Sequence, residues 1–510
     1  MKQLSALAAA ALLAPALLNA ADRPVKAVSV DECVQQALLK NLDIRIARFL
    51  PDLTRINLKG AYGAYDPNFT FGAGYDFNRS PGVQLAPGII TPALEQDADS
   101  FNSGLNGLLP TGTRYDLRGN VQRNRGDRSG GTVLPGEWGY FDYFGGATAT
   151  LTQPLLKNFW IDNARWTIQL GKKTVTQDEQ SLRLQIINTA TDVLIAYYNL
   201  SASRENVTVQ EKALELAERS LAENKKRVEV GAMAPLEEKQ AEALVASSKA
   251  DLLSARQSYR IAQNTLKSLM TDDFGGDDNQ LEPSEKLVPT PYVFSRQDSW
   301  HKGLTMRPDI LQSKLELEKQ QVTLRFRKNQ LLPQLDVDAS YGASGRSSRW
   351  PGNGSTGGTG DFFDQIGDRD NPRYGTGITL SFPLSNRAER SRLKASKLEL
   401  ERLLLRLKQL EQTIMVSIDN SILNAQTAFE RVEATKQARS YAEQALDAEQ
   451  KKLQNGKSTS FVVLRLQRDL TSARSDEFRA VADYFRSLAV LHRDEGATLE
   501  SLGIQFDPQK

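Results

Sequence analysis

The sequence predicts an α+β chain in which very long helices alternate with strands of membrane character. Residues 387–455 contain no Pro and no Gly, so they indicate one helix of roughly 100 Å at 1.5 Å per residue. Leu393, Leu400, Leu407 and Ile414 recur along it at heptad spacing. One soluble domain cannot bury such a rod, and we therefore expect it to pack along other helices.

The chain is predicted to be a tandem duplication. The motif Asn-Leu-Asp-Ile at 41–44 matches Arg-Pro-Asp-Ile at 307–310, and Leu-Thr-Gln-Pro-Leu at 151–155 matches Leu-Ser-Phe-Pro-Leu at 380–384. We therefore expect five regions. These are a signal peptide at 1–21, repeat 1 at 22–270, an acidic linker at 271–296, repeat 2 at 297–495 and a C-terminal tail at 496–510.

The first 21 residues have the pattern of a secretory signal. Lys2 precedes an apolar segment at 4–18, and the small residues at 19–21 suit cleavage. A single transmembrane anchor is the alternative, but the apolar segment is shorter than the ~20 residues that span a bilayer.

Composition excludes several classes of function. Lys and Arg number 64 against 62 Asp and Glu, a balance that argues against a nucleic-acid partner. The one cysteine, Cys33, lies beside Val34 on a predicted helix, so packing is expected for it rather than chemistry. The two histidines lie far apart in sequence, and a metal or general-base role is not expected for either.

No enzyme motif stands out. The chain has no nucleophile elbow, no His-Glu-x-x-His and no cysteine cluster. A Gly-x-Gly-x-x-Gly at 352–357 has neither a strand before it nor a helix after it, so we expect no dinucleotide and no other cofactor or metal.

Each repeat is expected to begin with a helix of about thirty residues. In repeat 1, Ser29 and Glu32 form a capping-box pattern, and Pro51 predicts a kink. In repeat 2 the corresponding helix is predicted at 297–330.

Strands of alternating polarity follow each helix, at 69–77 and 147–154 in repeat 1 and at 335–341 and 374–384 in repeat 2. A half-buried soluble strand has the same pattern, but the aromatic residues favour a transmembrane barrel strand. Residues 101–109 and 114–122 predict an additional hairpin. Pro154 and Pro383 are expected at strand-to-helix junctions, where an amide donor can be spared.

Long helices are then predicted at 163–230 and 387–455. Each ends at a glycine-containing turn and is followed by a shorter helix, at 236–270 and 461–491. The first helix of each repeat and the shorter helix after the turn are together about as long as the one long helix. Stacked end to end, these two short helices would complete a uniform helical wall beside it.

With these repeats, the chain resembles the TolC family of bacterial outer-membrane efflux and secretion ducts. The resemblance implies a homotrimer in the outer membrane that extends into the periplasm. About four strands per chain would form a shared twelve-stranded barrel, continued by a helical tunnel. It also implies an exit duct of a tripartite efflux pump or type I secretion system, working with a periplasmic adaptor and an inner-membrane transporter.

The resemblance further implies that the helical tips dock the adaptor and form the gate. The matching tip residues are Gly231, Ala232, Met233, Gly456, Lys457 and Ser458. The candidate constriction residues are Glu237, Val462 and Arg465. Where some members carry two aspartates, this chain has Val462 and Arg465, so a ring of arginines would favour anions. Alternatively, Arg465 pairs with Glu237 or Asp469, or points to solvent.

The alternative function is a non-conducting coiled-coil structural or adhesin-like protein of the cell envelope. It would explain the long helices but would leave the duplicated strands of alternating polarity unexplained. Drugs, metal ions, peptides and secreted proteins are all open as cargo of a duct.

Overall fold

The computed structural model describes residues 25–81, 84–87, 89–90, 94–129, 137–231, 233–276, 279–350 and 355–504. The predicted signal peptide, Ala232 and the start of the 352–357 glycine motif lie outside the described residues. The chain forms two compact units. Unit 1 holds the described parts of Met1–Phe49, Ser181–Ile310 and Leu410–Lys510, and unit 2 holds those of Leu50–Gln180 and Leu311–Gln409.

The first helical segment is divided at Asn41, into α1 (Val30–Lys40) and α2 (Leu42–Ala61). The predicted capping box is confirmed at the start of α1, between Ser29 and Glu32. The proline at 51, where a kink is predicted, does not end the helix, because α2 continues through that residue. Asn41 makes the break instead, since its Oδ1 accepts from the backbone N–H groups of residues 43 and 44 at 2.9 and 3.2 Å and so caps α2.

Repeat 2 breaks at the matching position. A single helix was predicted over 297–330, but the structure has α5 (Arg296–Met306) and α6 (Pro308–Gln330). Arg307 is extended, with φ −63° and ψ 128°. The cause is Pro308, because the residue before a proline is disfavoured in the helical region. The two breaks fall at the first residue of the duplicated motif.

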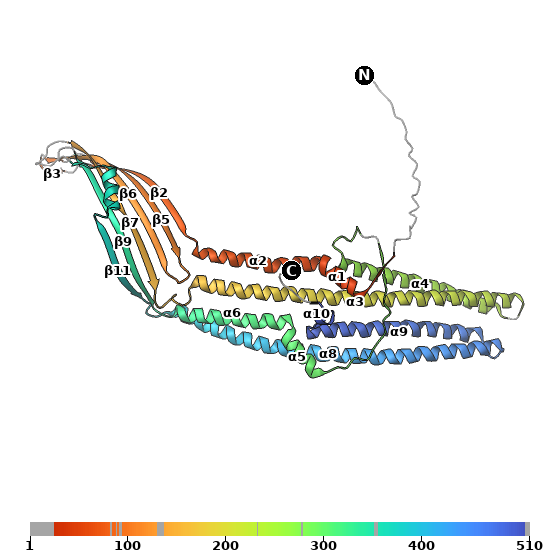
Figure 1. The fold of residues 1–510 in the computed structure, drawn as a ribbon. Helices are drawn as coiled ribbons and strands as arrows, with labels where there is room; N and C mark the ends of the chain where they lie inside the picture. Colours follow the sequence, from red (N-terminus) through yellow and green to blue (C-terminus); the bar gives the residue numbers. More distant parts are fainter. Residues whose placement is uncertain are drawn as a thin grey trace, which may run out of the picture. The chain divides into compact units, whose positions relative to one another are not determined.

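Unit 2 contains one antiparallel sheet in the order β2-β5-β6-β7-β9-β11, with the short β10 (Ser355–Thr356) also pairing with β9 (Figure 1). The six long strands are β2 (Asn68–Ser80), β5 (Leu94–Leu108), β6 (Arg114–Ser129), β7 (Glu137–Pro154), β9 (Gln334–Trp350) and β11 (Pro372–Ser381). Smaller elements in the unit are η1 (Tyr62–Tyr65), the pair β3 (Gln84–Ala86) and β4 (Ile89–Ile90), and α7 (Thr359–Gly367).

The prediction of about four strands per chain is therefore wrong, because the sheet has six long strands. The additional hairpin predicted at 101–109 and 114–122 belongs to β5 and β6. It lies between β2 and β7, with which it is paired over most of its length. In this position the backbone N–H and C=O groups on both outer edges of the hairpin are hydrogen-bonded to neighbouring strands. The hairpin therefore extends the sheet.

The long helices lie within one residue of their predicted ends, as α3 (Asn163–Glu229) and α8 (Arg387–Gln454). They are followed by α4 (Pro235–Met270) and α9 (Ser460–Glu495), and the chain then forms α10 (Thr498–Ser501). In unit 1 the hairpins α3/α4 and α8/α9 lie side by side (Figure 1). The heptad seam of α8 is confirmed, since Leu403 and Ile414 are buried while Leu405, off the seam, is exposed.

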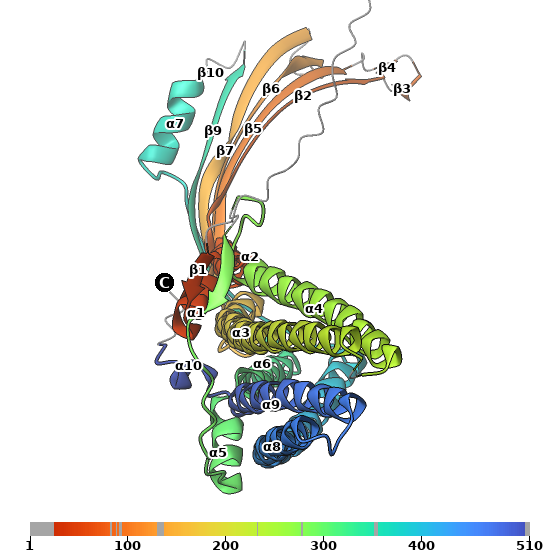
Figure 2. The same cartoon turned by 90° about the vertical axis from the view of Figure 1, so that its right-hand side faces the viewer.

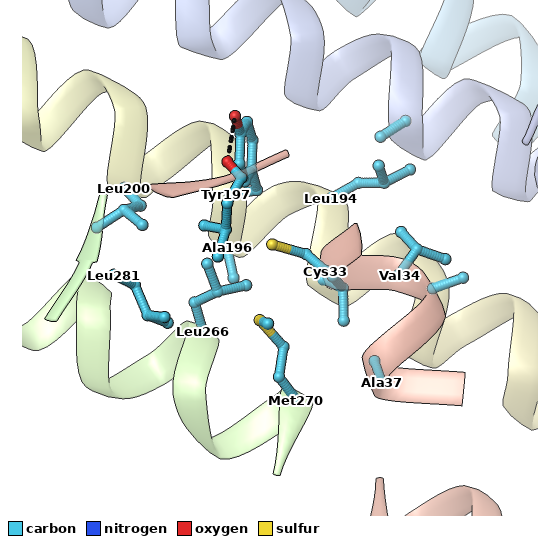
Figure 3. Packing of buried hydrophobic residues seen from close by; sticks show 14 residues of the cluster. Cys33, Val34, Ala37, Leu194, Ala196, Tyr197, Leu200, Leu266, Met270 and Leu281 are labelled. Carbon is cyan, nitrogen blue, oxygen red and sulfur yellow. Dashed lines mark hydrogen bonds between the residues drawn. The ribbon is translucent and has the colours of Figure 1, made fainter. Parts of the chain in front are cut away.

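One hydrophobic core of unit 1 joins α1, α3 and α4 to a small parallel sheet (Figure 3). Here β1 (Val25–Val28) pairs with β8 (Gln280–Pro283). The buried Tyr197 hydroxyl donates to the Val28 carbonyl at 3.3 Å. Leu281 is also buried, so the segment expected to be only a linker contributes β8 to the core. Cys33 packs in the same cluster, as predicted, and burial raises the pKa of its thiol to about 12.

Candidate channel wall and helical tips

Both tips are built on a glycine in the left-handed region. Gly456 has φ +71°, and the turn is a Schellman motif, with its N–H donating to Leu453 O and that of Lys457 donating to Lys452 O. Gly231 has φ +73° and donates to Val228 O in the same way. An added Cβ would meet no atom within 4 Å at either glycine. Backbone conformation alone therefore selects glycine at the tips.

The other tip residues differ in exposure and in polarity. Lys457 is exposed, and Met233 and Ser458 are half-buried. The Ser458 hydroxyl donates to the Glu449 carboxylate on α8. This bond, with help from Lys452 and then from the charge of Arg465, holds the pKa of Glu449 below its usual range. Ala232 lies outside the described residues.

The three candidate constriction residues lie in the first turns after the tips. Glu237 is half-buried in α4, Val462 is half-buried in α9, and Arg465 is exposed on α9. Among the ion pairs between described residues, none joins Arg465 to Glu237 or to Asp469. Within the described part of a single chain, Arg465 therefore does not pair with either of these two carboxylates.

A row of polar bonds joins α3 to α9 below the tips, and the sequence did not reveal it. Its bonds run from Asn224 Nδ2 to Ser460 Oγ at 2.8 Å, from Gln467 Nε2 to Ser220 Oγ at 3.3 Å and from Gln210 Nε2 to Ser475 Oγ at 3.4 Å. We call these six residues the polar seam. Asn224, Ser460 and Gln467 are buried. Polar residues on the inner face of a helix are the signal that could have indicated it, but their partners lie some 240 residues away.

The strand-to-helix junctions hold the two predicted prolines. Pro154 is the last residue of β7, and Pro383 lies between β11 and α8. The structure adds asparagines that the sequence did not single out. Asn158 and Asn386 have φ +66° and +43°, a region that asparagine tolerates better than most residues. Asn329 accepts from Asn158 N at 2.7 Å.

One face of the sheet is apolar, and we call it the apolar face. On β9 it is formed by alternate residues from Leu335 to Gly345, while Asp336 and Asp338 lie on the opposite face. Its register partners on other strands include Phe69, Phe71, Phe101, Leu105, Leu117, Ala147, Leu151 and Ile378. Phe69 and Ile378 are 67% and 74% exposed, so large apolar side chains of this face stay uncovered away from the short helix α7, which packs beside β9.

The apolar face has the height of a bilayer core. The ten-residue step from 335 to 345 covers ~33 Å along β9, and a strand tilt of about 40° reduces this to ~25 Å of thickness. Beyond this level the same face turns polar, where Asp99 pairs with Arg123 and Asp97 with Arg125. We call this end the polar rim. Tyr143 is the register partner of Arg123 there, and aromatic residues of this kind are enriched at membrane interfaces.

The two outer strands have free edges. Among the described strands, β2 pairs only with β5 and β11 only with β9. Unpaired edges are avoided in stable proteins because they template further pairing. The even number of long strands makes β2 and β11 antiparallel to each other, so one chain's β11 can pair with another chain's β2 in the pattern of the rest of the sheet.

A second uncovered surface runs along α2. Large apolar side chains recur on it at helical spacing and are at least half exposed, namely Leu42, Ile46, Phe49, Leu53 and Ile56. An apolar stripe of this length on a single helix indicates a packing partner outside the chain.

Within the described ranges, no helix combines the length and the apolar character that crossing a membrane requires. Likewise, no three His, Cys, Asp or Glu residues of those ranges are grouped as metal ligands would be.

An apolar sheet of bilayer height with two free strand edges, in a chain that also forms long helical hairpins, is typical of a channel subunit of the cell envelope. The chain belongs to the outer membrane efflux protein family, whose model matches residues 114–271 and 301–493. It is accordingly an outer-membrane protein that extends into the periplasm, of a family of channels rather than enzymes.

Similar proteins agree with this membership. The outer membrane efflux protein BepC of Brucella suis is 22% identical over 361 residues, which are 71% of this chain and 74% of that protein. The CmeC outer membrane channel of Campylobacter jejuni superposes with a TM-score of 0.63 at 15% identity, covering 92% of this chain and 86% of that one. VceC of Vibrio cholerae gives 0.63 at 16% identity, covering 92% and 96%. These structures share the fold.

Proposed function

We propose that the protein is the outer-membrane exit duct of a tripartite efflux pump or a type I secretion system. It conducts passively the substrate that an inner-membrane transporter delivers. The observation that carries this proposal is the apolar face with two free strand edges, because lipid covers such a face and further copies of the chain close such edges. The alternative, a coiled-coil structural protein without a lumen, would leave the apolar face and the free strand edges unexplained.

The free edges support a closed homo-oligomer, and family membership favours three copies. Three chains with six long strands each make an eighteen-stranded barrel instead of the twelve strands first expected. Because barrel diameter grows roughly linearly with strand number, this barrel would be about 1.5 times as wide. A barrel of this size leaves an aqueous channel.

The helices support the same assembly. The apolar stripe of α2 and the exposed Leu398 and Leu405 of α8 are surfaces that a neighbouring chain would bury. Burial of apolar area at about 25 cal/mol per Å² is the main term available to hold such helices together.

The tips are the proposed contact with a periplasmic adaptor. The residues assigned to it are Gly231, Ala232, Met233, Gly456, Lys457 and Ser458. The constriction is assigned to Glu237, Val462 and Arg465, each of which threefold symmetry would turn into a ring of three. Exposed Arg465 is the residue of this set that can set ion selectivity, because its charge is not consumed by an ion pair within the described chain.

The test is single-channel conductance of the purified full-length protein in planar bilayers. Arg465→Asp replaces three positive charges by three negative ones, so ion selectivity should move towards cations. Arg468→Asp is the matched control, with the same charge change on an exposed residue three positions along α9. Equal shifts in both variants would remove Arg465 from the constriction. A protein that forms no detergent-stable trimer and never conducts would refute the duct.

A further inference from the structure

We propose that the apolar face carries a binding site for the phosphorylated glycolipid of the outer leaflet. One acyl chain would lie in a groove beside α7, and a phosphate would bind Arg369. This inference rests on the proposed function, since it requires the apolar face to meet lipid.

The helix α7 is attached to the apolar face of the sheet, beside β9 (Figure 2). Phe362 is fully buried there. A Cβ on Gly345 would lie 2.5 Å from the Phe362 carbonyl oxygen, so only glycine allows the helix to approach this closely. The neighbouring Phe363 is 57% exposed. The helix therefore turns an aromatic side chain away from the protein, on the side of the sheet that faces lipid.

A groove of about 480 Å³ runs from α7 across five strands on this face. Its floor is made of small residues, with Ser103, Gly119, Ala147 and Ala343 in register across β5, β6, β7 and β9. Larger apolar side chains form its walls, namely Phe69, Leu105, Leu117, Tyr341 and Ile366. An apolar depression that is open to the hydrocarbon core can take an acyl chain.

Arg369 lies at one end of this groove. Its side chain is exposed, and no hydrogen bond or ion pair joins it to another described residue. Arg369 comes just after α7, which packs against β9 at Gly345. The polar rim begins at the level of Ser347, two residues further along β9. An unpaired guanidinium at the boundary between apolar band and polar rim lies where lipid phosphates lie, and Arg binds phosphate in bidentate fashion.

The position of α7 along the strands indicates which leaflet of the membrane the groove would meet. β9 begins four residues after α6 ends, so α7 lies towards the end of the sheet remote from the helices. Because the helices extend into the periplasm, this end faces outward. The lipid of the outer leaflet there is a glycolipid with phosphates on a diglucosamine head and several acyl chains, and an arginine above an acyl groove suits both parts.

The experiment uses delipidated full-length protein in detergent, with purified lipid A as the probe and phosphatidylglycerol as the second lipid. Native mass spectrometry counts lipids bound per assembly over a titration. Arg369→Gln removes the cation, and Ala147→Leu fills the groove floor. The controls are Arg373→Gln, an exposed arginine of β11 on the opposite face, and Ala339→Leu, on the apolar face outside the groove.

Lipid A should bind the wild type and both controls alike. Arg369→Gln should bind it about tenfold more weakly, as loss of one charge-assisted contact implies. Ala147→Leu should also bind it more weakly, because the leucine side chain would occupy the groove. Equal binding by all five proteins would overturn the site. Tighter binding of phosphatidylglycerol than of lipid A would overturn the glycolipid. Single-channel conductance of the same variants separates the two proposals. If Arg369→Gln conducts normally but binds lipid A as the wild type does, the lipid site is refuted and the duct is not.

Discussion

Ser460→Ala tests whether the polar seam holds the two hairpins of one chain together. The Ser460 hydroxyl accepts from Asn224 Nδ2 at 2.8 Å, and these residues are 3% and 5% exposed. Removing the hydroxyl leaves a buried amide unpaired, at a cost of about 1–3 kcal/mol. When α3 and α9 separate, water solvates that amide and the cost disappears. The variant should therefore shift the equilibrium towards separated hairpins by about 5- to 150-fold per chain.

Two measurements follow the shift. Hydrogen exchange of the backbone amides near Asn224 should accelerate by a similar factor, and the open probability of single channels should rise. Ser440→Ala is the control, because the Ser440 hydroxyl accepts from Gln444 Nε2 within the same helix, α8, and it should change neither quantity. Since the effect is local, the far-UV spectrum should be unaltered.

The reasoning fails if Ser460→Ala exchanges and conducts like the control. A double-mutant cycle with Asn224→Ala sharpens the result. If the bond is the cause, the double variant should be less destabilised than the sum of the single variants by about 1 kcal/mol. Strict additivity would show that the two side chains act separately.

Three further predictions concern the tip, the core and the subunit contact. Gly456→Ala, at φ +71°, should destabilise the tip by about 1–2 kcal/mol in hydrogen exchange; Gly358→Ala, at φ −136°, should not, and equal effects would contradict the turn. Cys33, whose pKa burial raises to about 12, should resist thiol reagents at about pH 8.5 until urea unfolds the protein. The stability it adds is complete below its unfolded pKa and is lost as pH rises towards 12; immediate labelling would refute this. Ile44→Ala, fully buried, should lower the free energy of unfolding by about 2–5 kcal/mol. Ile46→Ala, 66% exposed, should instead weaken the trimer on heating, and the reverse pattern would place the contact elsewhere.

The local parts of the fold were predictable from the sequence. The ends of α3 and α8 fell within one residue of prediction because a glycine turn follows each helix, and because α8 contains no Pro and no Gly. The capping box at Ser29 was equally local. The helix break was missed at Asn41, where a side chain caps the next helix, because Pro51 was the stronger apparent signal.

The non-local parts were not predictable in the same way. Whether the hairpin of β5 and β6 joins the sheet depends on pairing with β2 and β7, which alternation alone does not specify. The partner of Asn224 and the position of Arg369 beside the groove depend on segments that meet only in the fold. The tip residues were placed by resemblance, and their roles remain predictions.

The parallel pairing of β1 with β8 has a consequence for the order of folding. Val25 is paired with Gln280, so the strand nearest the amino end waits until more than half of the chain is available. The hairpins among β5, β6 and β7 need only short loops and can close early, whereas the β7–β9 pairing joins residues nearly two hundred apart. Closing such long loops is slow. The local hairpins should therefore form first, and the parallel β1–β8 pair should form last, after the helices have assembled.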